Sequence, residues 1–218
     1  MSSLRQLLAA HPTLLLIDST STRIQVGLWT AGAASVWQHS DTEAGSGVFA
    51  CVEALLAQAG RRIAEVDAFV FCEGPGSVLG IRTAAVALRT WQVINPNAAT
   101  YTYQSLDLVA RDLGRPELSV IADARRDTWH VAQLGQTLRR VPSAELAGEL
   151  VMPEFFRHWT PLPAGMGSTR YDVAALLENL PDADLFRAVT EPDAFSHEEP
   201  SYVTWTPQIH QAPPPRTS

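Results

Sequence analysis

Short apolar runs and turn residues alternate along the first part of the chain. Residues 14–17 form a leucine-rich run that ends at Asp18, and residues 24–28 alternate between apolar and smaller or polar side chains. A third run covers residues 34–38. Runs of this length, separated by serine, threonine and glycine, are typical of strands joined by turns. The pattern predicts an antiparallel meander at the start of the chain.

Two helices with a strand between them are predicted next. Residues 45–58 carry apolar side chains at helical spacing. Residues 66–71 are rich in β-branched and aromatic side chains, which predicts a buried strand. The second helix is predicted over residues 78–93.

This second helix has two different sides at about 100° per residue. One side carries Gly80, Ala84, Ala87, Leu88 and Trp91, and the other carries Val78, Arg82, Ala85, Val86, Arg89 and Val93. Small apolar residues on one side and mixed valine and arginine on the other suit a helix between a sheet and a second protein. A helix buried within its own domain is the alternative.

The same kinds of element recur further along the chain. A strand, a helix, a strand and a hairpin are predicted over residues 100–103, 105–113, 118–121 and 128–141, with a helix near residues 171–180. This order indicates a duplicated α/β fold with a shorter second copy. We expect a first lobe over residues 1–103, a smaller second lobe over residues 104–205, and a disordered tail over residues 206–218.

Composition narrows the class of protein. Of 218 residues, 46% are hydrophobic, which is enough for a substantial core, and the formal net charge of -7 disfavours nucleic-acid binding by this chain alone. The two cysteines form no CxxC motif, and His11 and Pro12 interrupt the N-terminal apolar run. These features argue against a disulfide framework, a signal peptide and a membrane span. We therefore expect a cytoplasmic protein.

A glycine-rich loop, Gly-Pro-Gly-Ser-Val-Leu-Gly at residues 74–80, precedes the second predicted helix. Free N–H groups at a helix start can bind phosphate, but this loop lacks both the Lys-Ser/Thr ending of a P-loop and the GxGxxG spacing. Ser77 does not stand in a GxSxG sequence. A helix cap is therefore a better interpretation of Ser77 than a nucleophile.

Asp18 and Asp123 each end a buried strand and precede a turn. In a duplicated fold the two carboxylates would face each other across a cleft that could hold a Mg²⁺-nucleotide, or each would only cap its turn. The six histidines show no paired metal-ligand spacing. The sequence therefore assigns no catalytic residue, no metal and no cofactor.

Five short stretches then stand in a characteristic order. They are Leu-Leu-Ile-Asp-Ser-Thr-Ser at residues 15–21, Gly-Pro-Gly-Ser at 74–77 with Gly80 and Arg82, Ser-Leu at 105–106, Asp-Ala-Arg at 123–125 and Glu-Pro-Ser-Tyr at 199–202. In this order the chain resembles the bacterial TsaB (YeaZ) family of tRNA threonylcarbamoyladenosine biosynthesis. The resemblance covers nearly all of residues 13–205.

The resemblance implies a duplicated actin/Hsp70-like ATPase (ribonuclease H-like) fold with two lobes. It also implies a subunit without catalysis of its own. Such a subunit binds TsaD, which transfers the threonylcarbamoyl group to the adenosine next to the anticodon, together with the ATPase TsaE. tRNA would be contacted only through that complex, and the isolated chain would form a homodimer.

Site residues follow from the same resemblance. The partner interface is assigned to the two helices of the first lobe, at Val48, Phe49, Val52, Leu55, Leu56, Arg82, Val86 and Arg89. The structural motif is assigned to Gly74, Pro75, Gly76, Ser77 and Gly80. A vestigial nucleotide cleft is assigned to Asp18, Ser19, Asp123 and Arg125.

The chain departs from the family pattern at two helix starts. Val78-Leu79 stands where the family has Phe-Thr, and Thr-Glu-Ala-Gly at residues 42–45 stands where the family has a histidine-containing entry. Two alternatives remain open. One is a small nucleotide-dependent kinase or ATPase that uses Asp18 and Asp123 around Mg²⁺. The other is a repurposed homodimeric interaction module. A peptidase has no supporting residues.

Overall fold

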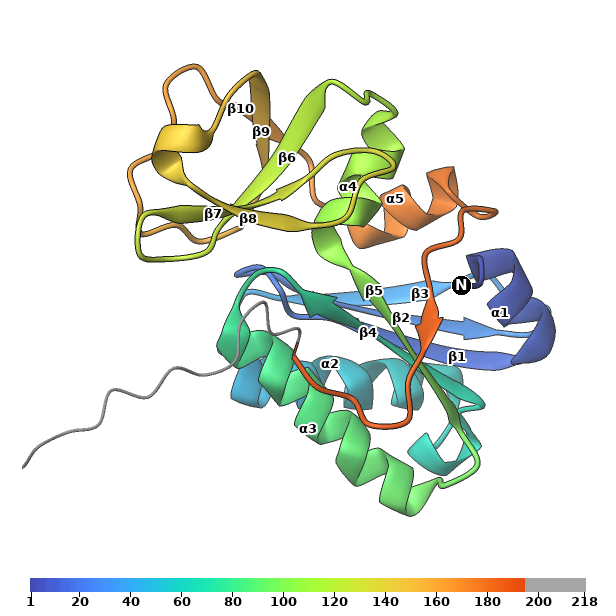
Figure 1. The fold of residues 1–218 in the computed structure, drawn as a ribbon. Helices are drawn as coiled ribbons and strands as arrows, with labels where there is room; N and C mark the ends of the chain where they lie inside the picture. The colour runs from blue at the N-terminus through green and yellow to red at the C-terminus, as the bar shows by residue number, and fades with distance from the viewer. Residues whose placement is uncertain (195–218) are drawn as a thin grey trace, which may run out of the picture.

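The computed structural model describes residues 1–194 of the chain. Two β-sheets lie on either side of a pair of helices, and two further helices cover the outer face of the first sheet (Figure 1). The predicted tail and the motif at residues 199–202 lie outside the described residues. Over residues 1–194, none of the helices has the length and apolar character needed to cross a membrane.

The first sheet begins with the predicted meander, here β1 (Thr13–Asp18), β2 (Ile24–Thr30) and β3 (Val36–Ser40). Two parallel strands, β4 (Ala68–Gly74) and β5 (Ala99–Gln104), extend it beyond β1. The two outer helices, α2 (Ala44–Ala59) and α3 (Val78–Ile94), pack on this sheet. The chain returns to the first sheet much later, where β11 (Arg187–Ala188) pairs with β5.

The second sheet repeats this arrangement. Its strands are β6 (Leu118–Asp123), β7 (Thr128–Ala132), β8 (Arg139–Pro142), β9 (Glu149–Pro153) and β10 (Gly167–Thr169). The order β10-β9-β6-β7-β8 matches β5-β4-β1-β2-β3, with antiparallel and parallel pairs in the same places. The predicted duplication is therefore confirmed at the level of strand order.

The second copy is also reduced, as predicted. Between β3 and β4 the first copy has α2 and a short 3₁₀ turn, η1 (Ile63–Glu65), whereas between β8 and β9 the second copy has only the 3₁₀ turn η2 (Ser143–Glu145). No helix stands between β9 and β10, where the first copy has α3. The outer face of the second sheet thus lacks the helical layer of the first (Figure 1).

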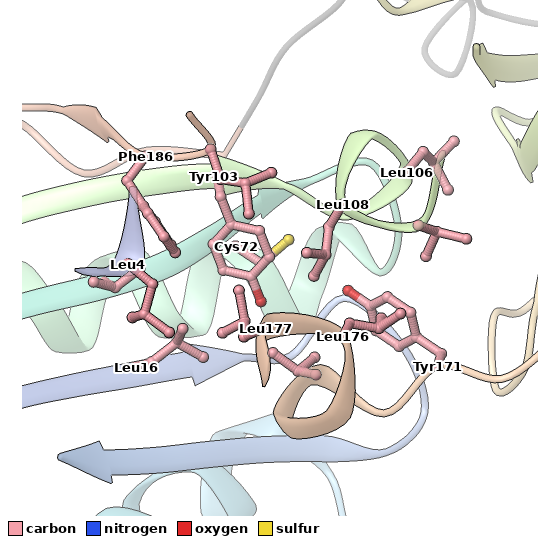
Figure 2. Packing of buried hydrophobic residues seen from close by; sticks show 14 of the residues in the cluster. Leu4, Leu16, Cys72, Tyr103, Leu106, Leu108, Tyr171, Leu176, Leu177 and Phe186 are labelled. Atoms are coloured by element: carbon pink, nitrogen blue, oxygen red, sulfur yellow. The ribbon is translucent and has the colours of Figure 1, made fainter. Parts of the chain in front are cut away.

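Alternate residues of β1 join the two parts of the core. Leu14 and Leu16 lie in a cluster between the sheets, which also contains α4 (Ser105–Leu113) and α5 (Val173–Asn179). Leu15 and Ile17 lie in the cluster beneath α2 and α3. Because both faces of β1 are covered, its sequence is a continuous run of apolar residues at positions 14–17. Figure 2 shows part of the cluster between the sheets.

The N-terminal helix α1 (Leu4–Ala10) was not predicted from the sequence. Ser3 and Gln6 form a capping box at its start, and Leu4 and Leu7 are buried. A helix of seven residues has little periodicity of its own, so its existence depends on burying those two leucines. The short strands β9 to β11 were also missed. Like α1, they are too short to show a clear pattern, and they depend on pairing with distant strands.

The contact between α3 and the loop after β1 leaves no space for a side chain at Gly80. A Cβ atom added there would lie 2.0 Å from the carbonyl oxygen of Ser19. We predict that Gly80→Ala lowers the free energy of unfolding by about 3 kcal/mol, since the helix must move off the sheet. Urea denaturation measures this change.

Gly45 provides the matched control, because it also lies in a helix but a Cβ atom added there would have no neighbouring atom within 4 Å. Gly45→Ala should raise the free energy of unfolding by about 0.5–1 kcal/mol. Equal effects of the two substitutions would contradict the close approach at Gly80.

Candidate functional site

Three of the sequence motifs meet at one end of the first sheet. The Ser19 hydroxyl donates to the Gly80 carbonyl at 2.8 Å, and the Ser77 amide donates to the Thr20 carbonyl at 2.6 Å. The Ser105 hydroxyl donates to the Pro75 carbonyl at 2.6 Å. These bonds join the loop after β1, the glycine-rich loop and the start of α4. The three motifs therefore hold one another in place by hydrogen bonds.

Ser77 has the role predicted for it. It is the N-cap of α3, and its side-chain oxygen accepts the Gly80 amide at 3.3 Å. Gly76 has φ +155°, and a Cβ atom there would lie 2.3 Å from the Thr20 carbonyl oxygen. The glycines thus allow the chain to turn closely against the first loop, as a packing role requires.

Asp18 ends β1 with a fully buried carboxylate. One oxygen accepts bonds from the Thr20 amide at 3.0 Å and the Thr20 hydroxyl at 2.7 Å. The other accepts the hydroxyls of Tyr103 and Tyr171, each at 2.6 Å. Tyr103 belongs to β5, while Tyr171 lies two residues before the start of α5, so one carboxylate joins the first sheet to the second half of the chain. Figure 2 shows both tyrosines within the buried cluster.

Both tyrosines remain hydroxyl donors at neutral pH. Burial raises the pKa of Tyr103 and of Tyr171 well above the usual value for a phenol, and the negative charge of Asp18 raises both further. The pKa of the Cys72 thiol is raised by the same two causes, in the same order. Cys51 and Cys72 are both buried free thiols.

Gln25 makes a second link across the same region. Its side-chain amide donates to the Tyr171 carbonyl at 3.1 Å, and its side-chain oxygen accepts the Val173 amide at 2.9 Å. Gln25 lies on β2 and is buried. Together with Asp18 it fixes the start of α5 against the first sheet.

Asp123, at the equivalent end of β6, holds two loops of the second sheet. One carboxylate oxygen accepts the Arg125 amide, and the other accepts the amides of Trp159 and Thr160 at 2.6 and 2.7 Å. Burial acts to raise the pKa of Asp123, but the three amide donors outweigh it and hold this pKa below its ordinary value. Asp123 therefore caps turns, which is one of the two alternatives that the sequence left open.

A Mg²⁺-nucleotide does not fit the residues of the predicted cleft. Both oxygens of Asp18 already accept protein hydrogen bonds, and the Ser19 hydroxyl donates to Gly80. The oxygens of Asp123 are occupied in the same way. Within residues 1–194, no three His, Cys, Asp or Glu side chains are grouped closely enough to hold a metal ion.

The predicted interface residues divide into two groups. Four of them are buried beneath their own helix, which corrects their assignment to a surface: Val48, Val52, Leu55 and Leu56. They occupy the side of α2 that packs on the sheet, so their regular spacing results from packing in the core and not from an interface. The other four are exposed: Phe49, Arg82, Val86 and Arg89. On α3, Ala85 is also buried, although it was expected on the outer side.

Sequence reasoning missed part of the apolar surface of α3. Leu79 is 73% exposed, and Ile94 is 54% exposed at the end of the helix. We define the α3 face as six exposed residues that lie within about 100° of the helix circumference: Val78, Leu79, Arg82, Val86, Arg89 and Val93. Four apolar side chains on the outer side of a helix are the sequence signal that identifies this face.

The segment at residues 189–194 borders this face. The Arg89 side chain donates to the Pro192 carbonyl at 2.7 Å and lies 3.5 Å from a carboxylate oxygen of Asp193. Gln92 donates to the Thr190 carbonyl at 3.4 Å. Arg89 is therefore partly engaged within the chain, whereas the Arg82 side chain forms no ion pair or hydrogen bond with a residue in 1–194.

The tyrosine hydroxyls at Asp18 give a direct test of this site. We predict that Tyr171→Phe lowers the free energy of unfolding by about 1.5–3 kcal/mol, because a buried charge loses a donor. Tyr101→Phe is the matched control. Its hydroxyl bonds to the ring of half-buried His11 at 2.9 Å, and its loss should cost about 0.5–1.5 kcal/mol. Equal losses in urea denaturation would contradict the role of Asp18.

The lowered pKa of Asp123 predicts that the free energy of unfolding depends on pH. Its contribution to stability is present above the pKa of an unfolded aspartate, about 3.9, and is lost as the pH falls through the lower folded value. Asp123→Asn should lower the free energy of unfolding at pH 7 by about 1–3 kcal/mol and flatten its decline below pH 4. Denaturation at a series of pH values measures both effects. If the free energy of unfolding of the variant falls as steeply below pH 4 as that of the wild type, a group other than Asp123 causes the decline.

Known proteins share this arrangement of sheets and helices. No family model and no curated protein sequence matches the chain. YeaZ from Pseudomonas aeruginosa is similar in structure, with a TM-score of 0.58 and 19% identity over 76% of this chain and 90% of that one. An uncharacterized protein "with similarity to peptidase YEAZ from Pseudomonas aeruginosa" has a TM-score of 0.59 and 19% identity, over 77% and 89%. The chain therefore has the fold of these two structures, a duplicated, actin-like α/β fold.

Proposed function

We propose that this chain is a divergent TsaB-like subunit that binds and supports a TsaD-like threonylcarbamoyltransferase in tRNA modification, without catalysis of its own. The observation that carries the proposal is the α3 face, an exposed apolar stripe on a helix that the family resemblance assigns to partner binding. The YeaZ-like fold and the family motifs support the same function.

The chemistry of the α3 face suits a protein partner. Val86 is 57% exposed, and Val93 is 83% exposed. Contiguous exposed apolar side chains rimmed by charge are typical of protein interfaces. Arg82 supplies a guanidinium for a carboxylate on the partner, and arginine is enriched in the centres of such interfaces.

The enzyme alternatives have less support from the geometry. A kinase or ATPase needs an acidic side chain that can bind Mg²⁺, and Asp18 and Asp123 both accept hydrogen bonds from the protein instead. A serine peptidase needs a base beside its nucleophile. The hollow that Ser77 lines contains Arg157 but no histidine among its described lining residues.

The homodimeric module uses the same surface as the proposed subunit. Two copies could pack their α3 faces together when no partner is present, because the apolar side chains would then be removed from water. We propose that self-association and TsaD binding compete for this face. A TsaE-like ATPase would join the assembly in the cytoplasm, and tRNA would reach this chain through the complex.

Co-expression with the TsaD-like protein of the same genome tests the proposal. We predict co-elution in size exclusion for the wild-type chain and its loss for Val86→Asp, because a charge is then buried in the interface. Leu162→Asp is the control, since Leu162 is an exposed leucine in the second half of the chain, 43% accessible. It should co-elute as the wild type does.

Two outcomes separate the alternatives. Absence of co-elution for the wild-type chain, with a homodimer that Val86→Asp disrupts, would favour the interaction module and contradict the proposed subunit. Co-elution that neither substitution disturbs would contradict the assignment of the α3 face. Matching thermal unfolding of the three chains excludes misfolding as the cause.

A further inference from the structure

The loop between β6 and β7 has an uncommon backbone. Three consecutive residues that are not glycine have positive φ angles, 63° at Arg125, 52° at Arg126 and 57° at Asp127. Each such residue costs on the order of 1 kcal/mol, and conformations of this kind cluster at functional sites. The loop is fixed by the Asp123 carboxylate and by the Arg140 side chain, which donates to the Ala124 carbonyl at 3.1 Å.

A second loop lies against the first and presents a tryptophan. The amides of Trp159 and Thr160 donate to the same Asp123 carboxylate that holds Arg125. The guanidinium of Arg125 lies 4.2 Å from the centre of the Trp159 ring, which is within cation–π distance. Trp159 is nevertheless 58% exposed. Asp123 thus holds an arginine and an accessible indole in a fixed arrangement.

These two loops line an open hollow of about 450 Å³. Its lining residues are Arg125, Arg126, Asp127, Trp159, Thr160 and Pro161. The Arg126 side chain is exposed and forms no hydrogen bond or ion pair with any residue in 1–194. Among the described lining residues, Arg125 and Arg126 are positive and Asp127 is the one acidic residue, so the lining side chains carry a net positive charge in a chain of net charge -7. The Asp123 carboxylate behind them is occupied by three backbone amides.

We propose that this hollow binds a single unpaired nucleotide, with the base stacked on Trp159 and the phosphate held by Arg126 and Arg125. An indole and a guanidinium are the groups that proteins use to stack bases and to bind phosphates. The nucleotide could be free or part of single-stranded RNA, since both have the same base and phosphate. This inference goes beyond the proposed function and holds whether or not the chain binds a TsaD-like partner.

The nucleotide fits the hollow better than the other anionic ligands. An acidic peptide would use the two arginines but would leave the exposed indole without a flat partner. A duplex would require more phosphate contacts than two arginines provide, and the negative net charge of the chain opposes it. One base with one phosphate uses the ring and both charges.

Fluorescence anisotropy with fluorescein-labelled hexaadenylate RNA tests this site, with AMP as a competitor. We expect saturable binding that AMP displaces. Trp159→Ala should weaken binding about tenfold, and Trp159→Phe should retain most of it because a flat ring remains. Arg126→Ala should lower the slope of the logarithm of affinity against the logarithm of salt concentration by about one, the value expected for the loss of one phosphate contact. Arg61→Ala, which removes an exposed arginine just after α2, should have no effect.

The competitor identifies the source of the nucleotide. If AMP alone binds as tightly as hexaadenylate, the site accepts a free nucleotide; tighter binding of hexaadenylate indicates single-stranded RNA. The proposal is overturned if neither probe binds at millimolar concentration, if Trp159→Ala binds as the wild type does, or if a hexaglutamate peptide competes as well as AMP. Circular dichroism of each variant shows that it is folded.

Discussion

The buried carboxylate of Asp18 is the interaction on which the rest of the structure depends. A buried charge is tolerated only when hydrogen bonds replace the water that it has lost, and Asp18 accepts bonds from Thr20, Tyr103 and Tyr171. These donors come from the loop after β1, from β5 and from the segment before α5. Satisfying one charge therefore fixes the relation between the two sheets.

The hydrogen bonding of the strand-end carboxylates also limits where a ligand could bind. In a duplicated fold the ends of β1 and β6 are the natural place for a ligand between the lobes. Here Asp18 and Asp123 serve the fold instead, by joining strands and holding loops. The accessible features are the α3 face, on the outer helix, and the hollow beside Trp159, whose two loops are held by Asp123 at the end of β6.

Much of the fold could be predicted, because its central strands and helices carry strong local patterns. The meander, α2 and α3 follow from apolar periodicity, and Ser77 could be assigned as a cap from its place before a helix. Elements that depend on distant contacts were missed, such as α1 and β11. Periodicity also could not separate buried from exposed residues on α2, since Val52 is buried against the sheet while Phe49 is exposed.

The tyrosine partners of Asp18 were beyond sequence reasoning for a related reason. Tyr171 lies 153 positions from Asp18, and nothing in its local sequence indicates a bond to a buried carboxylate. The Arg125–Trp159 pair depends in the same way on two loops that meet only in the folded protein. Local pattern predicts elements, whereas these pairs arise from the way in which the two sheets pack.

The central claim is that the chain serves tRNA modification through its outer helix. The most direct measurement is the threonylcarbamoyladenosine content of tRNA, determined by mass spectrometry of nucleosides, in cells that lack this gene. The account predicts that the modified nucleoside is lost, that the wild-type gene restores it, and that a gene carrying Val86→Asp does not. Unchanged threonylcarbamoyladenosine after deletion would contradict the account.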